Sequence, residues 1–178
     1  TRELNPDERD RLLAHLLALS PEDRRLRFAH AIADDGLQRY VEGIDFTRDT
    51  VFVATDAELH VVGAAHVARD GEHAELGVSV LPQARGHGIG AALLERSAIH
   101  ARNAGVRVLF MNCLVENAPM LHLARKQGLQ VAVSSGEAEA FVRLPRPSLP
   151  ILASAAVAAH RGLIDHAHNA SWVGLPGL

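Results

Sequence analysis

Apolar residues recur at helical spacing along the first 45 residues of the chain. Leu12, Leu13 and Leu16 fall on one face of a helix with about 3.6 residues per turn. Ser20 supplies a capping side chain directly before a proline and two acidic residues, which is typical of a helix start. The sequence therefore predicts three helices, over residues 6–19, 20–33 and about 35–41.

Short β-branched runs replace this spacing after Asp45. Residues 51–54 and 61–65 are apolar and are separated by a turn-forming segment, which predicts an antiparallel hairpin. Residues 73–80 alternate between apolar and polar or small side chains, so this strand has two distinct faces. Further helices are predicted over residues 88–104 and 117–127, and further strands over residues 106–115, 129–133 and 138–144. We therefore expect an α/β (α+β) fold with a mixed sheet flanked by helices.

Prolines separate the end of the chain from this pattern. Pro145, Pro147 and Pro150 precede an alanine-rich stretch, residues 152–166, that has helical character. We expect one domain over residues 1–145 and a C-terminal helical extension and tail over residues 146–178. The extension would pack on the domain or on a second subunit, so either a monomer or a homodimer fits the sequence.

Composition excludes several classes of function. The 178 residues are 48% hydrophobic with a net charge of −3, so the chain can bury one core and lacks the basic excess of nucleic-acid-binding proteins. Residues 151–159, the most apolar stretch, are far fewer than the roughly 20 residues that span a bilayer. The first residues lack a secretory pattern, and Cys113 is the single cysteine, so no internal disulfide can form. We expect a cytoplasmic protein with no metal site and no membrane or nucleic-acid partner.

The loop at residues 83–90, Gln-Ala-Arg-Gly-His-Gly-Ile-Gly, carries the clearest chemical signal. Its three glycines follow a predicted strand and precede a predicted helix. Glycine lets the backbone turn sharply and brings N–H groups close to a ligand, and a helix N-terminus favours an anion. The loop therefore predicts a phosphate or pyrophosphate site, with Arg85 as a charged donor at its mouth.

Two other kinds of phosphate loop fit this segment less well. A Walker loop requires a Gly-Lys-Ser/Thr sequence, which does not follow here. A dinucleotide-binding loop requires glycines spaced G-x-G-x-x-G, an early first strand and an acidic residue about 20 residues later. The glycines here are spaced G-x-G-x-G in the middle of the chain, and only Glu116 lies in a comparable place. An NAD(P)-binding oxidoreductase is therefore the third hypothesis.

The segment 76–94 closely resembles motif A of the GNAT superfamily, Q/R-x-x-G-x-G/A, including the apolar strand before the loop. Residues 117–129 resemble the second acyl-CoA segment of that family, in which an asparagine opens a helix ending in Lys-x-Gly and an apolar residue. The resemblance covers about residues 47–145 and implies the GNAT fold, with a twisted mixed sheet that splits beside the loop. It also implies acetyl-CoA as cosubstrate. The implied contacts are Val78, Ser79 and Val80 with the pantetheine arm, Arg85, Gly86, His87, Gly88, Ile89, Gly90 and Ala91 with the pyrophosphate, and Asn117 near the pantetheine.

Glu75 is the candidate general base, because an amine must lose a proton when it accepts an acetyl group. By alternation it lies on the face of its strand opposite Ala74 and Leu76, either directed into a cleft or exposed on a solvated face. The sequence around Glu75, residues 116–125 and residues 19–28 resemble the catalytic domain of bacterial Pat-type protein lysine acetyltransferases. That resemblance implies that Glu75 is the base, and it extends the similarity to about residue 16.

The sequence lacks the acid that often protonates the departing thiolate. Many GNAT enzymes place a tyrosine on the helix after the asparagine, and the resembling position here is Ala124. Tyr40, the one tyrosine, lies outside the motifs, whereas His66 and His73 flank the Glu75 region as proton relays or as surface residues. We expect an N-acetyltransferase that acts on a primary amine such as a protein lysine. The alternative is a non-catalytic acyl-CoA-binding regulatory module.

Overall fold

A single mixed sheet forms the centre of the computed structural model, which describes residues 1–134 and 137–144. Its strand order is β1-β2-β3-β4-β5-β7-β6, and β4 and β5 form its one parallel pair within these residues. The strands are β1 (Arg2–Glu3), β2 (Thr50–Thr55), β3 (Val61–Asp70), β4 (His73–Val80), β5 (Val108–Leu114), β6 (Gln130–Ser134) and β7 (Glu137–Arg143). The extension predicted over residues 146–178 lies outside the described residues.

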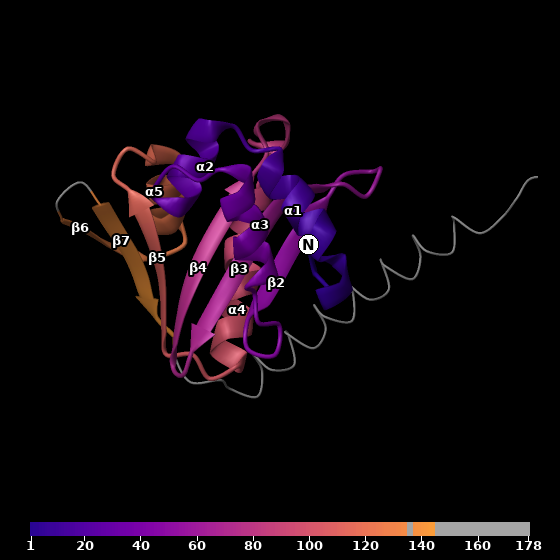
Figure 1. Ribbon diagram of the computed structural model, residues 1–178. Coiled ribbons are helices and arrows are strands. Elements are labelled where there is room, and N and C mark those ends of the chain that lie inside the picture. The colour runs from indigo at the N-terminus through magenta and orange to yellow at the C-terminus, as the bar shows by residue number, and fades with distance from the viewer. Residues whose placement is uncertain (135–136, 145–178) are drawn as a thin grey trace, which may run out of the picture.

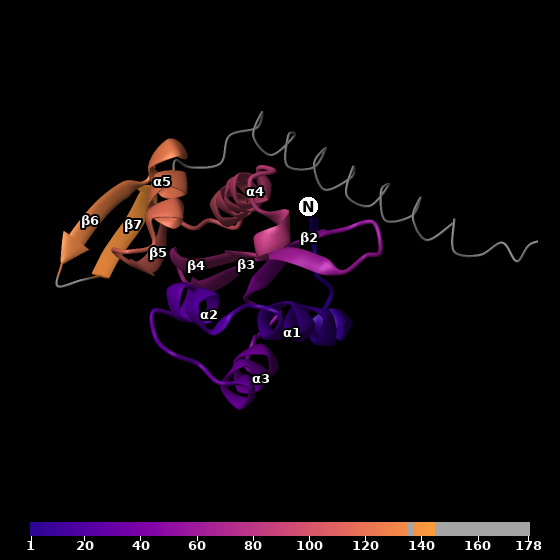
Figure 2. The same cartoon turned by 90° about the horizontal axis from the view of Figure 1, so that it is seen from above.

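Helices cover both faces of the sheet (Figure 2). The N-terminal helices α1 (Arg9–Leu17), α2 (Pro21–Phe28) and α3 (Asp34–Glu42) lie on one face, and α4 (Ile89–Asn103) and α5 (Ala118–Lys126) lie on the other. Two short 3-10 helices, η1 (Pro6–Glu8) and η2 (Pro82–Ala84), precede α1 and the glycine loop. The predicted mixed sheet flanked by helices is confirmed.

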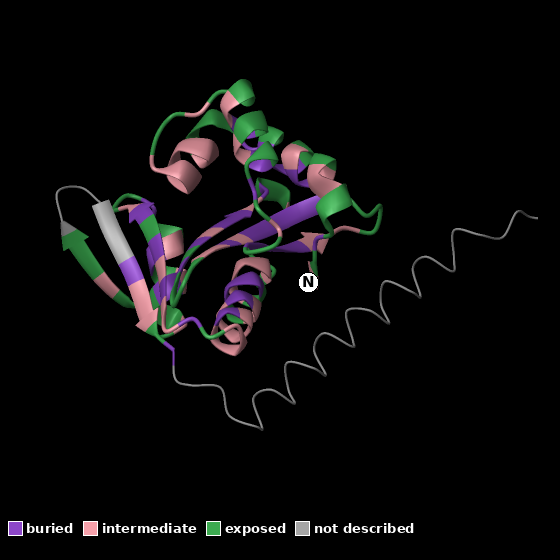
Figure 3. Cartoon of the chain, turned by 60° about the horizontal axis from the view of Figure 1, so that its bottom comes forward, coloured by how far each residue is buried: buried purple, intermediate pink, exposed green. Residues whose placement is uncertain are grey.

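Each face of the sheet has its own apolar core, visible as buried segments in Figure 3. Ala74, Leu76 and Val78 of β4 pack with the α4 face, in a core that also holds Leu93 and Leu94. Leucines of α1 and α3 fill the opposite core together with valines of β2 and β3: Leu12, Leu16, Leu37, Val51, Val53 and Val61. Strand β4 thus gives its even-numbered residues to one core and turns its odd-numbered residues toward the N-terminal helices, as its alternation predicts.

Several element boundaries differ from the sequence-based expectation. The second helix ends at Phe28 rather than near residue 33, because Ala29 adopts a left-handed conformation (φ 62°) that stops it. Strand β3 runs five residues beyond the predicted end, since it pairs with β4 as far as Asp70. Strand β1 is only two residues long and leaves no periodic signal. Among the described helices, none is long and apolar enough to cross a bilayer.

Candidate functional site

The parallel pair β4–β5 opens into a gap along its length. The two strands pair only where His73–Glu75 lies beside Val108–Phe110. Beyond Glu75 the strands diverge toward α2 and α5 (Figure 1), while β4 stays paired with β3 and β5 stays paired with β7. The edge of β4 from Leu76 onward therefore has no strand partner on the β5 side, and its polar backbone groups there are available to a ligand.

A cavity of about 570 Å³ lies at this gap. This volume is in the range of small-molecule and cofactor sites. Its lining comes from four separate parts of the chain: the N-terminal helices (Leu19, Asp23, Leu26, Arg27), the end of β4 (Val78, Ser79, Val80), the loop and start of α4 (Ala84, Arg85, Gly86, Gly88, Ile89, Gly90, Ala91) and α5 with its cap (Asn117, Pro119, Met120, His122, Leu123, Lys126). Ten of the eleven predicted cofactor-binding residues lie in this lining, whereas His87 is exposed outside it.

The glycines of the loop have two different physical roles. Gly86 and Gly88 have φ angles of 81° and 78°, a left-handed conformation that disfavours other residues. Gly90 lies against α5, where an added Cβ would be 3.3 Å from a methyl carbon of Leu123. Helix α4 begins at Ile89 without a side-chain cap, so its first N–H groups are open toward the cavity. The loop and the helix start thus have the backbone geometry that anion sites use, and anion binding here stays a prediction.

The guanidinium of Arg85 is already paired with protein groups. It donates to Asp23 Oδ1 at 2.6 Å and to the Val80 carbonyl at 3.0 Å. The expected charged donor at the mouth is therefore held by a carboxylate of α2. Any pyrophosphate at this end of the cavity would rest mainly on backbone N–H groups.

Helix α2 bridges the open end of the gap. Arg25 forms an ion pair with Glu116 at the turn between β5 and α5, and Asp23 reaches the glycine loop through Arg85. Asn117, which caps α5 by accepting from Met120 N–H at 3.3 Å, also donates to the Leu26 carbonyl at 3.4 Å. Both polar atoms of the Asn117 amide therefore have protein partners, and its predicted role near the pantetheine stays a prediction.

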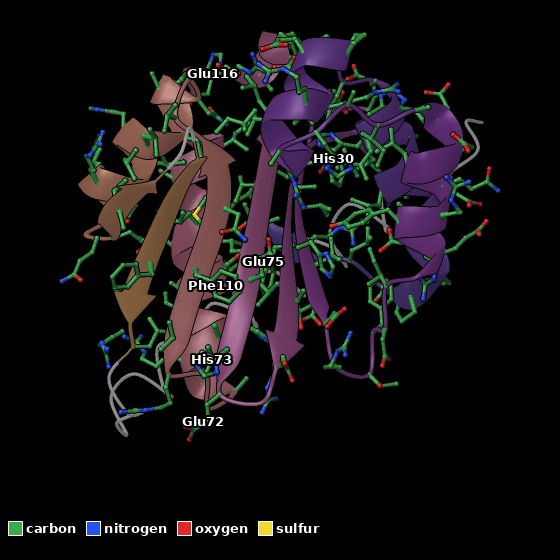
Figure 4. All side chains as sticks on the ribbon, turned by 60° about the vertical axis from the view of Figure 1, so that its left-hand side comes forward. His30, Glu72, His73, Glu75, Phe110 and Glu116 are labelled. Atoms are coloured by element: carbon green, nitrogen blue, oxygen red, sulfur yellow. The ribbon has the colours of Figure 1, made fainter. Side chains whose placement is uncertain are left out.

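Glu75 lies at the closed end of the gap, as the last residue of β4 that pairs with β5. Figure 4 shows it beside Phe110 on the neighbouring strand. Its carboxylate is exposed and accepts a hydrogen bond from Asn112 Nδ2 at 3.3 Å. Glu75 is outside the cavity lining, three residues before the lining residue Val78, on the face of β4 turned toward the N-terminal helices.

The other candidates for proton transfer occupy very different places. Ala124 is completely buried in the core, so that position supplies no acid. His66 is largely covered rather than on the surface, with its side chain 11% exposed, and burial, followed by the charge of Arg27, lowers its pKa to about 4. His73 is exposed two residues before Glu75. Burial also raises the pKa of the Cys113 thiol, which disfavours the reactive thiolate.

Sequence reasoning missed the contribution of the N-terminal helices to the cavity wall. His15 of α1 is buried, with Nδ1 3.0 Å from the Val61 carbonyl and Nε2 2.8 Å from Ser79 Oγ. Burial lowers the pKa of His15 to about 4, so the neutral ring donates from Nδ1 and accepts the Ser79 hydroxyl at Nε2. Arg27 of α2 lines the cavity itself, whereas His15 is connected to it only through the lining residue Ser79. No local motif marks either residue as part of a site, because only the packing of the helices on the sheet brings them there.

Comparison with known proteins points to the same family as the glycine loop and the gap between β4 and β5. The acetyltransferase (GNAT) family matches residues 14–129. Streptothricin acetyltransferase from Streptomyces lavendulae is 31% identical over 119 residues, which cover 60% of this chain and 62% of that enzyme. The chain thus spans less than two thirds of the length of that relative.

Solved structures share the fold at low sequence identity. The GNAT domain of S. lividans PAT is similar with a TM-score of 0.69 and 22% identity, over 80% of this chain and 89% of that one. The protein yncA from Salmonella typhimurium, described with its cofactor acetyl-CoA, has a TM-score of 0.61 and 19% identity, over 84% of this chain and 95% of that one. A doubly wound parallel sheet, which the dinucleotide alternative requires, does not match the one parallel pair of the described sheet. The chain belongs to the acetyltransferase (GNAT) family.

Proposed function

We propose that the chain is an acetyl-CoA-dependent N-acetyltransferase that acts on a primary amine. The observation that carries this proposal is the cavity at the β4–β5 gap, with the glycine loop at its open end and the Glu75 carboxylate outside its lining, toward the closed end of the gap. The loop and the α4 N-terminus lie at the open end, and Glu75 lies where the two strands meet. A long cofactor with a phosphorylated end and a reactive thioester end fits between them.

The cofactor would be held mostly by backbone groups. The N–H groups from Arg85 to Ala91 would bind the pyrophosphate, and the unpaired edge of Val78 to Val80 would bind the pantetheine arm as an added strand would. The direction of binding follows from this arrangement. The acetyl group would lie toward Glu75, since the pyrophosphate is fixed at the other end by the loop.

The residues at the closed end would then carry the chemistry. Glu75 takes a proton from the acceptor amine, directly or through a water, while the amine nitrogen bonds to the acetyl carbon and the carbon–sulfur bond breaks. A backbone N–H on the unpaired edge of β4 stabilises the negative charge that develops on the carbonyl oxygen. Because Ala124 offers no proton, the coenzyme leaves as a thiolate and is protonated by water.

The acceptor is a primary amine on this proposal, with a protein lysine as one candidate. Support comes from the fold shared with the S. lividans PAT domain and from the family of the chain. Other acetyltransferases with this fold are named for spermidine and for the alanine of a ribosomal protein, so the fold accommodates both small and protein-borne amines.

The test is release of free thiol from acetyl-CoA with a panel of amines and lysate proteins, beside calorimetric binding of acetyl-CoA. Turnover with at least one amine supports the proposal. Tight binding of acetyl-CoA with no turnover on any acceptor would favour a non-catalytic acyl-CoA-binding regulatory module, to which the alanine at position 124 also points. Thermal stabilisation by NAD(P) without stabilisation by acetyl-CoA would contradict both.

A further inference from the structure

The guanidinium of Arg27 lies directly over the middle of β4. It extends from the end of α2 onto Gly77, where an added Cβ would be 2.0 Å from the Arg27 Cζ and about as close to both terminal nitrogens. A side chain at position 77 and the guanidinium cannot occupy the same space. Because Gly77 has no side chain, the guanidinium of Arg27 packs directly on the strand, between Glu75 and the cavity residue Val78. We call this space above Gly77 the seat of Arg27.

A chain of hydrogen bonds and aromatic rings holds Arg27 on this seat. Its Nη2 donates to the Tyr40 hydroxyl at 3.0 Å, and the Phe28 ring centroid lies 4.7 Å from Cζ. Tyr40 in turn donates to His66 Nδ1 at 2.6 Å, since neutral His66 accepts there when its Nε2 faces the Asp49 carboxylate at 3.4 Å. The hydrogen bonds of this network are donated away from Arg27, first to Tyr40 and then to His66. Because only one N–H of the guanidinium takes part, its other N–H donors can bind a ligand.

Arg27 differs from its neighbours on α2 in its charge pairing. Arg24 is paired with Asp34, and Arg25 is paired with Glu22 and Glu116. Among the described residues, no carboxylate lies within ion-pair distance of Arg27, although its side chain is half-buried and lines the cavity. A guanidinium partly removed from water, with four of its five N–H donors unused by protein hydrogen bonds, is suited to bind an anion.

The position of this anion site separates it from the pyrophosphate site. Arg27 and Glu75 share the face of β4 that is turned toward the N-terminal helices, and positions 75 and 77 are about 6.6 Å apart along a strand. The glycine loop lies beyond the far end of β4. An anion on Arg27 would therefore belong to the molecule whose amine reaches Glu75.

We propose that the acceptor is an amino acid whose carboxylate, a few bonds from its amine, is bound by Arg27 while Glu75 receives the proton of the amine. This inference rests on the proposed acetyltransferase function. A planar guanidinium binds a carboxylate through two parallel hydrogen bonds, which would fix the amine at a set distance from Arg27. Tyr40 and Phe28 act as positioning residues for Arg27.

The first experiment measures binding and does not depend on turnover. Isothermal titration of the protein loaded with coenzyme A compares L-lysine, glycine and γ-aminobutyrate with their amides, which keep the amine and lose the carboxylate charge. We expect at least one amino acid to bind tenfold or more tightly than its amide. Arg27→Gln should remove this difference. Arg27→Lys should keep part of it, because lysine keeps the positive charge but cannot donate two parallel hydrogen bonds. Equal binding of acids and amides by the wild type would overturn the proposal.

Kinetics then separate this role from two others that Arg27 could have. Arg27→Gln should raise KM for amino acids about tenfold and leave kcat and the acetyl-CoA dissociation constant nearly unchanged. Equal loss of kcat with acids and amides would instead assign Arg27 to the thioester carbonyl, and weaker acetyl-CoA binding would assign it to the cofactor. Either result overturns carboxylate binding. Absence of turnover with every amine, together with intact amino-acid binding, would count against the acetyltransferase function alone.

Two further variants control for misfolding. Gly77→Ala places a methyl group on the seat of the guanidinium and should reduce the preference for carboxylates as Arg27→Gln does. Arg39→Gln removes an exposed arginine of α3 that pairs with Asp35, and should change neither binding nor kinetics. A melting temperature within a few degrees of wild type shows that each variant is folded, and a Gly77→Ala protein with an unchanged preference would contradict the proposed seat.

Discussion

Two walls of the cavity are built in different ways. One wall, from Val78 to Ala91, is a continuous stretch of chain that presents backbone groups and glycines. The other comes from Leu19 and α2, which are more than 50 residues away in sequence and present side chains such as Asp23 and Arg27. On the proposed function, the first wall would bind the cofactor through backbone geometry, whereas the second would select the acceptor through side-chain chemistry. The difference teaches that, on this proposal, cofactor binding and acceptor choice are encoded in separate parts of the sequence.

The largest expected effect comes from Glu75, which lies where strands β4 and β5 meet. Glu75→Gln keeps the shape and the hydrogen bond from Asn112 but cannot take a proton. We expect kcat to fall by about 100-fold or more, the usual contribution of a general base, while the acetyl-CoA dissociation constant stays the same. Steady-state thiol release, measured from pH 6 to 9 with a saturating amine, checks this.

Glu72 provides a matched control for Glu75. It is an exposed glutamate in the turn before β4, labelled with Glu75 in Figure 4. Glu72→Gln should leave the rate within twofold of wild type. A Glu75→Gln protein that also retains the wild-type rate would remove Glu75 from the mechanism.

The second prediction concerns the free energy of unfolding at acidic pH and the packing of the N-terminal helices on the sheet. His15 and His66 are both buried with pKa values near 4, below the usual 6.5. Between pH 6.5 and 4 the unfolded chain therefore binds more protons than the folded chain, so stability falls as the pH is lowered. Each histidine should contribute a slope of up to about 1.4 kcal/mol per pH unit. Urea unfolding at pH 7, 5.5 and 4.5 measures this slope.

The slope can be assigned to one residue by substitution. His15→Gln removes one titrating group, and the pH dependence of the free energy of unfolding should decrease. His30→Gln replaces an exposed histidine and should leave the slope unchanged. Identical slopes in wild type and His15→Gln would show that acid does not act through this contact of α1 with β4.

The contrast between the walls also explains what the sequence could predict. The glycine loop, the alternation of β4 and the capping asparagine of α5 are local features, and each one predicted its element correctly. The partners of those residues are not local. Gly77 reads as an ordinary small residue in a strand, and only the packing of α2 shows that it accommodates Arg27. Likewise, no pattern in the sequence places His15 on Ser79 or Asp23 on Arg85.

The third prediction addresses the backbone wall. Gly88→Ala places a β-carbon on a residue with φ 78°, which costs about 1 kcal/mol. We expect about fivefold weaker binding of acetyl-CoA, because the loop relaxes away from the conformation that directs its N–H groups into the cavity. Gly71→Ala is the matched control, since Gly71 has φ 57° in the distant β3–β4 turn. Both variants should lose similar stability in urea, and equal acetyl-CoA affinity in the two would contradict the role of the loop.

The smallest expected effect tests the one ion pair that joins the two walls. Asp23 holds Arg85 beside the anion site, with the Asp23 side chain 15% exposed and that of Arg85 49% exposed. A partly exposed pair of this kind contributes less than about 1 kcal/mol to stability. Asp23→Asn should therefore leave folding nearly intact. It removes a negative charge next to the incoming phosphates and frees Arg85 to reach them.

We expect the Asp23→Asn protein to bind acetyl-CoA about two- to threefold more tightly at low salt. The gain should disappear near 1 M salt, where the screening length falls to about 3 Å. Asp35→Asn breaks an equally charged pair on α3, away from the cavity, and should show no such gain. Weaker binding in Asp23→Asn at every salt concentration would mean that the ion pair is needed to hold α2 over the cofactor. In that case the two walls act together in binding the cofactor, and the separation between cofactor binding and acceptor choice would not hold at this end of the cavity.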